Sequence, residues 1–193
     1  PEYPLVNKIQ NIIRHHDVNL ILNLHDGSGF YTKTYIDKRH NPYKWGQSCI
    51  IDQAQIKHEK YGQLHDMAQR AQAHINSHLL QKNHHFGVKN THTAQGDIEM
   101  ARSLTYYAMK QNKPAFGIEG SKDLPTFERV YYHLLALESF MTQMNIKFTR
   151  RFNLTRIGVW HAINHDIDIT LYNSLHLPLK NARKQLRYFP MPK

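Results

Sequence analysis

Cysteine is almost absent from this sequence of 193 residues, which contains only Cys49. A single cysteine excludes an internal disulfide and a cysteine-rich zinc module. Because Cys49 lies in the apolar run SCII, we expect a small buried hydrophobic residue rather than a reactive nucleophile.

Long apolar runs are also missing from the sequence. No stretch approaches the roughly 18 apolar residues that are needed to span a bilayer, so no transmembrane segment is predicted. The opening residues PEYPLVNKIQ have neither the charged n-region nor the apolar h-region of a signal peptide. This does not fix where the protein acts, because a processed or truncated chain would lack a signal peptide as well.

Acidic residues are scarce relative to basic ones, since 15 Asp and Glu face 25 Lys and Arg and the formal net charge is +10. This balance favours an anionic partner. The basic residues are spread along the chain, however, and neither zinc-finger spacing nor an aromatic RNP-like strand is present. We therefore expect no specific nucleic-acid binding, whereas a polyanionic small substrate or a cell-wall polymer would suit the charge.

The apolar pattern predicts an α/β domain, in which helices and short buried strands alternate. A first helix presents Leu5, Ile9, Ile12 and Ile13 on one face, and a strand over residues 18–24 is expected to be buried on both faces. The further predicted elements are a long loop over 26–47, a strand at SCII, a polar helix over 56–82, a loop over 84–97, a helix from an Asp97 cap to about Lys110, a strand over 113–119, and an amphipathic helix over 124–144 with Pro125 in its first turn.

The character of the sequence changes near residue 150. The stretch DIDITLYNSLHLPL alternates as half-exposed strands do, with a tight turn expected at Asn173 and Ser174. We predict an α/β domain over residues 1–150, followed over 151–193 by a linker and the incomplete start of a β-rich accessory domain.

The stretch ILNLHDGSGF combines an apolar run with a histidine, an aspartate and two glycines. It lacks the lysine of a phosphate-binding loop and the flanking glycines of a nucleophile elbow. What remains is His25 at the carboxyl end of a central strand, where open α/β sheets bind their ligands. The glycines are expected to turn the chain so that His25 faces a cleft, although a loop histidine without a function stays possible.

Glu119 also ends a buried strand, in AFGIEG. A carboxylate at such a place is costly unless it is used or paired, so a salt bridge to a nearby Lys or Arg is the alternative to a functional role. If both strands belong to one sheet, His25 and Glu119 could line one cleft. A histidine that holds a metal beside a glutamate that acts as a base is the arrangement of metal-assisted amide hydrolysis.

Two other histidine pairs have the spacing of metal ligands on one helix face, in HINSH (74–78) and HAINH (161–165). Neither contains the glutamate of the HExxH motif. Because the chain has 15 histidines, we interpret both pairs as chance.

LNLHDGSGFY, followed some ninety residues later by AFGIEGSK, resembles the zinc carboxypeptidases of the M14 (carboxypeptidase A-like) family. More narrowly, it resembles the peptidoglycan DL-carboxypeptidases that set helical cell shape in spiral bacteria. The resemblance covers most of residues 1–150 and implies a mixed sheet flanked by helices, with β-rich accessory domains after it. It also implies that His25 is a zinc ligand and that Glu119 is the general base that activates the zinc-bound water.

One departure from the family pattern concerns the remaining zinc ligands. The family takes two of them from an upstream H-x-x-E or Q-x-x-E motif, which this sequence lacks, and its carboxylate-binding arginines normally lie near that motif. We expect both in an upstream segment of the same polypeptide, and we expect the present segment to be inactive without them, because a catalytic zinc needs about three protein ligands.

Substrate contacts are suggested by the same resemblance. Trp45 is a candidate wall for the diaminopimelate end of a substrate, and Thr105 and Tyr106 are candidate polar contacts, with Tyr107 an equal choice to Tyr106. Ordinary packing is the alternative for all of them.

The function that the resemblance implies is a periplasmic zinc carboxypeptidase that trims the C-terminal residue, diaminopimelate, from peptidoglycan tripeptide stems. Two other functions remain open at this point. One is a zinc deacylase of the succinylglutamate desuccinylase or aspartoacylase type, which could share both strand ends, the one with His25 and the one with Glu119. The other is a non-catalytic protein that binds a polyanion or the cell wall.

Overall fold

The computed structural model of the chain describes residues 3–96, 99–166, 168–171 and 175–178. Its α-helices are α1 (Pro4–Arg14), α2 (Leu64–Asn76), α3 (Leu104–Lys110), α4 (Thr126–Gln143) and α5 (Arg156–His161). Its strands are β1 (Ile21–Gly27), β2 (Phe30–Tyr31), β3 (His40–Asn41), β4 (Ser48–Ile51), β5 (Gly87–Asn90), β6 (Ala115–Ser121), β7 (Asp168–Leu171) and β8 (Leu175–Pro178). Short helical turns are η1 (Lys82–His84), η2 (Thr93–Gln95), η3 (Met100–Arg102) and the π-helical η4 (Ala162–Asp166).

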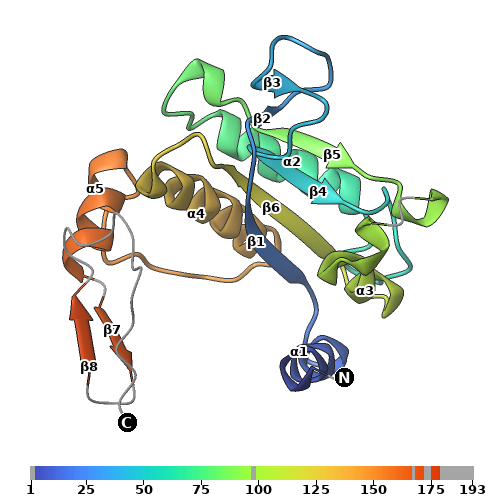
Figure 1. The fold of residues 1–193 in the computed structure, drawn as a ribbon. Helices are drawn as coiled ribbons and strands as arrows, with labels where there is room; N and C mark the ends of the chain where they lie inside the picture. Colours follow the sequence, from blue (N-terminus) through green and yellow to red (C-terminus); the bar gives the residue numbers. More distant parts are fainter. Residues whose placement is uncertain (1–2, 97–98, 167, 172–174, 179–193) are drawn as a thin grey trace.

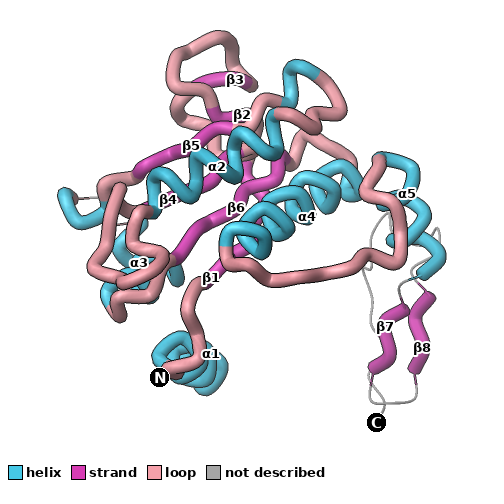
Figure 2. The backbone as a smooth tube through the Cα atoms, turned by 180° about the vertical axis from the view of Figure 1, so that it is seen from behind, coloured by secondary structure: helices cyan, strands magenta, loops and turns pink. Residues whose placement is uncertain are grey.

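A mixed sheet with the strand order β1-β6-β4-β5 forms the centre of the molecule. β1 pairs with β6 in parallel, β4 pairs with β6 antiparallel, and β4 pairs with β5 in parallel. Helices α2 and α4 pack against one face of this sheet, which Figure 2 shows from their side. The predicted mixed α/β sheet flanked by helices is therefore confirmed.

The main hydrophobic core lies between the sheet and helices α2 and α4. Alternate residues of β6, Phe116 and Ile118, point into it, as do Cys49 and Ile51 of β4. All of them are almost inaccessible, and the predicted burial of Cys49 is confirmed at 0% exposure. Burial of this kind also raises the pKa of the Cys49 thiol, so the residue is not a nucleophile.

The strand that we expected to be buried on both faces is partly exposed in the described part of the chain. β1 lies at one end of the four-stranded sheet and pairs only with β6 among the strands that the structure describes. Its Leu24 is 48% exposed. An apolar run predicts a strand but contains no information on its place in the sheet, which depends on pairing with residues far along the chain.

One predicted helix boundary is wrong, and one strand was not predicted. The helix expected over 56–82 begins only at Leu64, because the chain first makes a tight turn in which Ile56 N donates to Gly62 O. A Cβ at Gly62 would lie 2.5 Å from Ile56 O, so this turn needs glycine. In addition, the loop expected over 84–97 contains β5, whose four residues are too short to show a period of their own.

The segment before α3 also differs from the prediction. Asp97, the expected helix cap, lies outside the described residues, and the structure caps α3 with Ser103, whose Oγ accepts a hydrogen bond from Tyr106 N. The amphipathic helix with Pro125 at its start is confirmed as α4, for which Pro125 is the N-cap residue.

After α4 the chain forms α5 and η4, whose Val159 and Ile163 join the main core. It then forms the antiparallel hairpin of β7 and β8, while the turn expected at Asn173 and Ser174 lies outside the described residues. The division into domains at residue 150 stays a prediction. Among the described helices, none combines the length and the apolar character that a membrane span requires.

Candidate active site

The parallel register of β1 and β6 brings His25 and Glu119 side by side. The two residues are direct partners in the ladder, and Ser48 of β4 is the antiparallel partner of Glu119. Residues in one row of a sheet point to the same face. These three side chains therefore lie on the face opposite the main core, which we call the cavity face.

A cavity of about 250 Å³ opens on the cavity face between β1, β6, β4 and the start of α3. It is lined by Asn23, His25, Trp45, Ile50, Met100, Ser103, Thr105, Gly117 and Glu119. The structure thus brings together His25, Glu119, Trp45 and Thr105, which the sequence predicted as site residues. Tyr106 is not among the lining residues.

The glycines of the HDGSGF corner have two different roles. Gly29 adopts a positive φ of 59° and provides the turn that we expected. Gly27 instead allows a close approach, because a Cβ there would lie 2.6 Å from the Cβ of Trp45. A Cβ at Gly46 would lie 2.1 Å from Gly29 O. The missing side chains therefore let Trp45 sit directly beside the end of β1.

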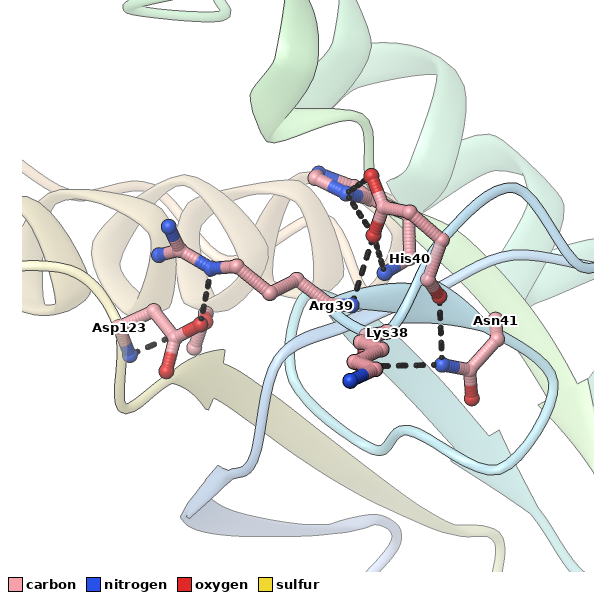
Figure 3. Close-up of polar contacts among 7 residues, drawn as sticks. Lys38, Arg39, His40, Asn41 and Asp123 are labelled. Carbon is pink, nitrogen blue, oxygen red and sulfur yellow. Dashed lines mark hydrogen bonds and ion pairs between the residues drawn. The ribbon is translucent and has the colours of Figure 1, made fainter.

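The loop that carries Trp45 is anchored at its tip to the segment after β6, as Figure 3 shows. The backbone N–H groups of Arg39 and His40 each donate to the Asp37 carboxylate at 2.7 Å. Arg39 Nε then donates to Asp123 Oδ2 at 2.9 Å. Closer to the cavity, Ser48 Oγ donates to Trp45 O at 2.6 Å. A distant contact thus holds the tip of the loop, and a local one holds the backbone of Trp45.

Glu119 has an unusual electrostatic environment. Burial, and to a smaller extent the nearby carboxylate of Asp26, raise the pKa of Glu119 to about 7, although Lys122 and Lys89 act in the opposite direction. Glu119 forms no ion pair with the residues that the structure describes, so the salt-bridge alternative finds no support. A carboxylate whose pKa lies near neutrality can accept and return a proton at working pH.

The opposite side of β1 is tied to α4 by charged groups. Asp26 forms an ion pair with Arg129 and lies 3.4 Å from His133 Nε2. Burial lowers the pKa of His133, although its hydrogen bond to Asp26 acts in the opposite direction. Because Asp26 follows His25 in the strand, these contacts hold that end of β1 against α4 and His25 toward the cavity face.

The donor set fits part of a catalytic metal site. The imidazole of His25 is exposed and makes no side-chain hydrogen bond to another described residue, so its nitrogens are available as ligands. In the part of the chain that is described, the only three metal-ligating side chains with ligand atoms within 4.8 Å of one another are His15, His16 and Asp17, none of which lines this cavity. The cavity itself thus offers one imidazole ligand beside one carboxylate.

The two helical histidine pairs lie outside the cavity. The rings of His74 and His78 are 4.8 Å apart, and those of His161 and His165 are 4.4 Å apart. Neither pair lines the cavity or gathers a third ligand among the described residues.

Thr105 and Tyr106 differ in their surroundings. Thr105 is 3% exposed, and its Oγ1 lies 3.0 Å from Ser103 Oγ at the cavity wall. Tyr106 is half-buried, and its ring lies under Lys110 Nζ at 5.7 Å from the centroid. Tyr107 packs instead against the small second core of Ile13, Ala108 and Ala115.

Five lining residues were missed by sequence reasoning: Asn23, Ile50, Met100, Ser103 and Gly117. For Asn23 a signal existed, because it is a polar residue in an apolar strand, two positions before His25 and hence on the same face. Met100 and Ser103 carry no comparable signal, since only the packing of α3 against β1 and β6 brings them here.

Residues 1–164 match the peptidase M99 family, described as "carboxypeptidase controlling helical cell shape catalytic". Two solved structures of cell shape determinant Csd4 from Helicobacter pylori are similar to the chain, one described as the mDAP-bound form of a D,L-carboxypeptidase and one bound to a tripeptide. Each is 44% identical, has a TM-score of 0.83, and covers 86% of this chain and 40% of its own. A search of curated proteins found no match.

The chain thus spans about 40% of the length of the solved structures that it matches. The match to the family includes both strand corners, with His25 and Glu119, and the cavity between them. The chain belongs to the family of catalytic domains of carboxypeptidases that control helical cell shape.

Proposed function

We propose that the chain is the later part of the catalytic domain of a zinc carboxypeptidase. Its substrate would be the peptidoglycan tripeptide stem, from which it removes the C-terminal diaminopimelate. The observation that carries this proposal is the pairing of His25 with Glu119 in one cavity, on a chain 44% identical to a D,L-carboxypeptidase. The structures of that relative with mDAP and with a tripeptide support the substrate class.

His25 would hold the zinc ion, together with ligands from an upstream segment of the same polypeptide, in the arrangement of the M14 carboxypeptidases. Bound zinc supplies Lewis-acid chemistry, which polarises a carbonyl and makes water more acidic. Since about three protein ligands are needed, His25 would not retain zinc alone, and the segment by itself would be inactive.

Glu119 would act as the general base. Its position beside His25 and its pKa near 7 suit a group that takes a proton from the attacking water. The same carboxylic acid would then return the proton to the leaving amine as the peptide bond breaks.

Trp45 and Thr105 would position the substrate. Trp45 forms an apolar wall of the cavity, and Thr105 lines it beside Ser103 at the start of α3. Tyr106 would contribute only if substrate binding moved α3, because it does not line the cavity here. The net charge of +10 suits a substrate rich in carboxylates.

Action on the cell wall would place the enzyme in the periplasm. Residues 151–193 would then lead into a β-rich accessory domain, of which the β7–β8 hairpin would be the first part.

The test is the turnover of a muropeptide tripeptide by the full-length protein. Replacing Glu119 by Gln keeps the size of the side chain but removes the base, so we expect kcat to fall about 10²- to 10⁴-fold. Glu59→Gln, at an exposed glutamate outside the cavity, is the matched control and should leave kcat unchanged. Undiminished turnover in Glu119→Gln would show that the assigned role is wrong.

A further inference from the structure

Lys89 extends the row of residues that forms the cavity floor. Asn23, Gly117, Ile50 and Lys89 are successive partners across β1, β6, β4 and β5. The first three of these residues line the cavity, and Lys89 does not. Because partners in a row point to the same face, Lys89 rises from the sheet on the cavity face, one strand beyond the cavity.

The ammonium group of Lys89 lies under the loop that carries Trp45. Its Nζ donates to the backbone carbonyls of Pro42 at 3.0 Å and Lys44 at 3.2 Å. The same Nζ lies 3.8 Å from the ring centroid of Trp45 and 5.1 Å from that of Tyr31. One cation therefore contacts both the backbone and the aromatic rings of this loop.

These contacts complement those of Ser48. Ser48 Oγ fixes the backbone carbonyl of Trp45, but it places no restraint on the indole ring. A cation over the face of tryptophan is attracted by the ring quadrupole, and the attraction is strongest for this side chain. The ring orientation thus depends on Lys89, while the position of the backbone depends on Ser48 and on the glycines beside it.

We propose that Lys89 is a positioning residue of the active site, which orients the Trp45 ring as a wall for the C-terminal residue of the substrate. This role rests on the proposed function, because it acts through a residue assigned to substrate binding. Lys89 itself takes no part in the proton transfer and does not contact the scissile bond. Its loss would chiefly weaken substrate binding, and its effect on the chemical step would be limited to the small contribution by which Lys89 lowers the pKa of Glu119.

The test uses the full-length protein with Lys89→Met, which keeps the apolar stem and removes the ammonium. We expect the KM for the tripeptide to rise about tenfold, with kcat within about threefold of the parent. Lys89→Arg retains a cation that stacks on aromatic rings and should restore most of the affinity.

A spectroscopic measurement reports on Trp45 directly. The protein is labelled with 5-fluorotryptophan, and its Trp45 signal is assigned by ¹⁹F NMR of the Trp45→Phe variant. In Lys89→Met this signal should shift and broaden. If Lys89→Met fails to fold, Lys89→Gln takes its place, since it can keep one carbonyl contact without the charge and should move the signal in the same way.

Lys113 supplies a matched control. Its Nζ also donates to two backbone carbonyls, those of His15 at 3.0 Å and Val18 at 2.6 Å, but it lies outside the cavity. Lys113→Met should therefore change neither the KM nor the Trp45 signal.

Two results would overturn the role of Lys89. The first is a Trp45 signal that stays unchanged in both the Met and Gln variants, and the second is a loss in kcat that matches the loss in kcat/KM. An absence of tripeptide turnover in the parent protein would instead contradict the proposed function. The ¹⁹F signal would still decide whether Lys89 orients Trp45.

Discussion

The two faces of the central sheet are built from alternate residues of the same strands, yet they differ in packing and in charge. On the face toward α2 and α4, β6 contributes Phe116 and Ile118, both almost fully buried. On the cavity face the same strand contributes Gly117 and Glu119, which line an open cavity. One face thus stabilises the fold, and the other leaves space and a reactive group.

Buried carboxylates on the two sides of the sheet also differ in whether they form ion pairs. Two buried glutamates of α4 are each paired with an arginine of the following segment, Glu128 with Arg156 at 2.7 Å and Glu138 with Arg150 at 2.6 Å. Glu119 on the cavity face has no such partner among the described residues, and its pKa is raised. The carboxylates of Glu128 and Glu138 are thus neutralised by ion pairs, whereas that of Glu119, the proposed general base, forms none with the described residues.

The largest effect on stability is expected from Phe116→Ala. The ring is fully buried and lies 4.5 Å from that of Phe140, so its removal leaves a cavity in the main core. We expect the free energy of unfolding to fall by about 3–5 kcal/mol, measured by urea denaturation of the full-length protein.

The neighbouring substitution Gly117→Ala tests the other face. A Cβ there would lie 3.2 Å from that of Ile50, so a small adjustment accommodates it. We expect a cost of about 1 kcal/mol or less. Equal losses in the free energy of unfolding for Phe116→Ala and Gly117→Ala would contradict the view that the core face, rather than the cavity face, stabilises the fold.

Arg156→Met should have the next largest effect, because it leaves the carboxylate of Glu128 buried without its cation. Glu128 is 3% exposed, whereas Arg156 lies largely at the surface. We expect a loss of about 2–3 kcal/mol in the free energy of unfolding. Adding Glu128→Gln to Arg156→Met should recover part of the loss, and no recovery would mean that the two residues do not act as a pair.

A smaller effect, of opposite sign, is expected from Glu119→Gln. Because the folded protein holds the Glu119 proton more tightly than the unfolded chain does, this residue makes the fold less stable as the pH rises from about 4.5 to 7. At pH 7.5 without added metal, Glu119→Gln should raise the free energy of unfolding by about 1–3 kcal/mol, and at pH 4 by little. A gain that is the same at both values would argue against a raised pKa.

The smallest expected effects distinguish Thr105 from Tyr106. Thr105→Val removes a buried hydroxyl at the cavity wall, so the KM for the tripeptide should rise about 2- to 10-fold. Tyr106→Phe should change the KM by less, since Tyr106 lies outside the lining. The reverse order would show that α3 moves when substrate binds.

Sequence reasoning identified the elements that carry the site more reliably than their arrangement. Helices α1 and α4 follow from local apolar periodicity, and strands β4 and β6 follow from short apolar runs. The two site residues His25 and Glu119 follow from polar side chains at the ends of such runs. β5 was missed because its four residues, GVKN, form no apolar run. The helix α2 was extended too far because the turn closed by Gly62 interrupts a helical pattern.

By itself, the sequence determined that His25 and Glu119 would each lie near the carboxyl end of a strand, because the chemistry of neighbouring residues decides local structure. Only the tertiary structure decided that these residues are register partners and that Trp45 and Thr105 reach the same cavity. The raised pKa of Glu119 is likewise a result of the tertiary structure. Each of these depends on contacts between residues far apart in the chain, which local propensity and periodicity do not encode.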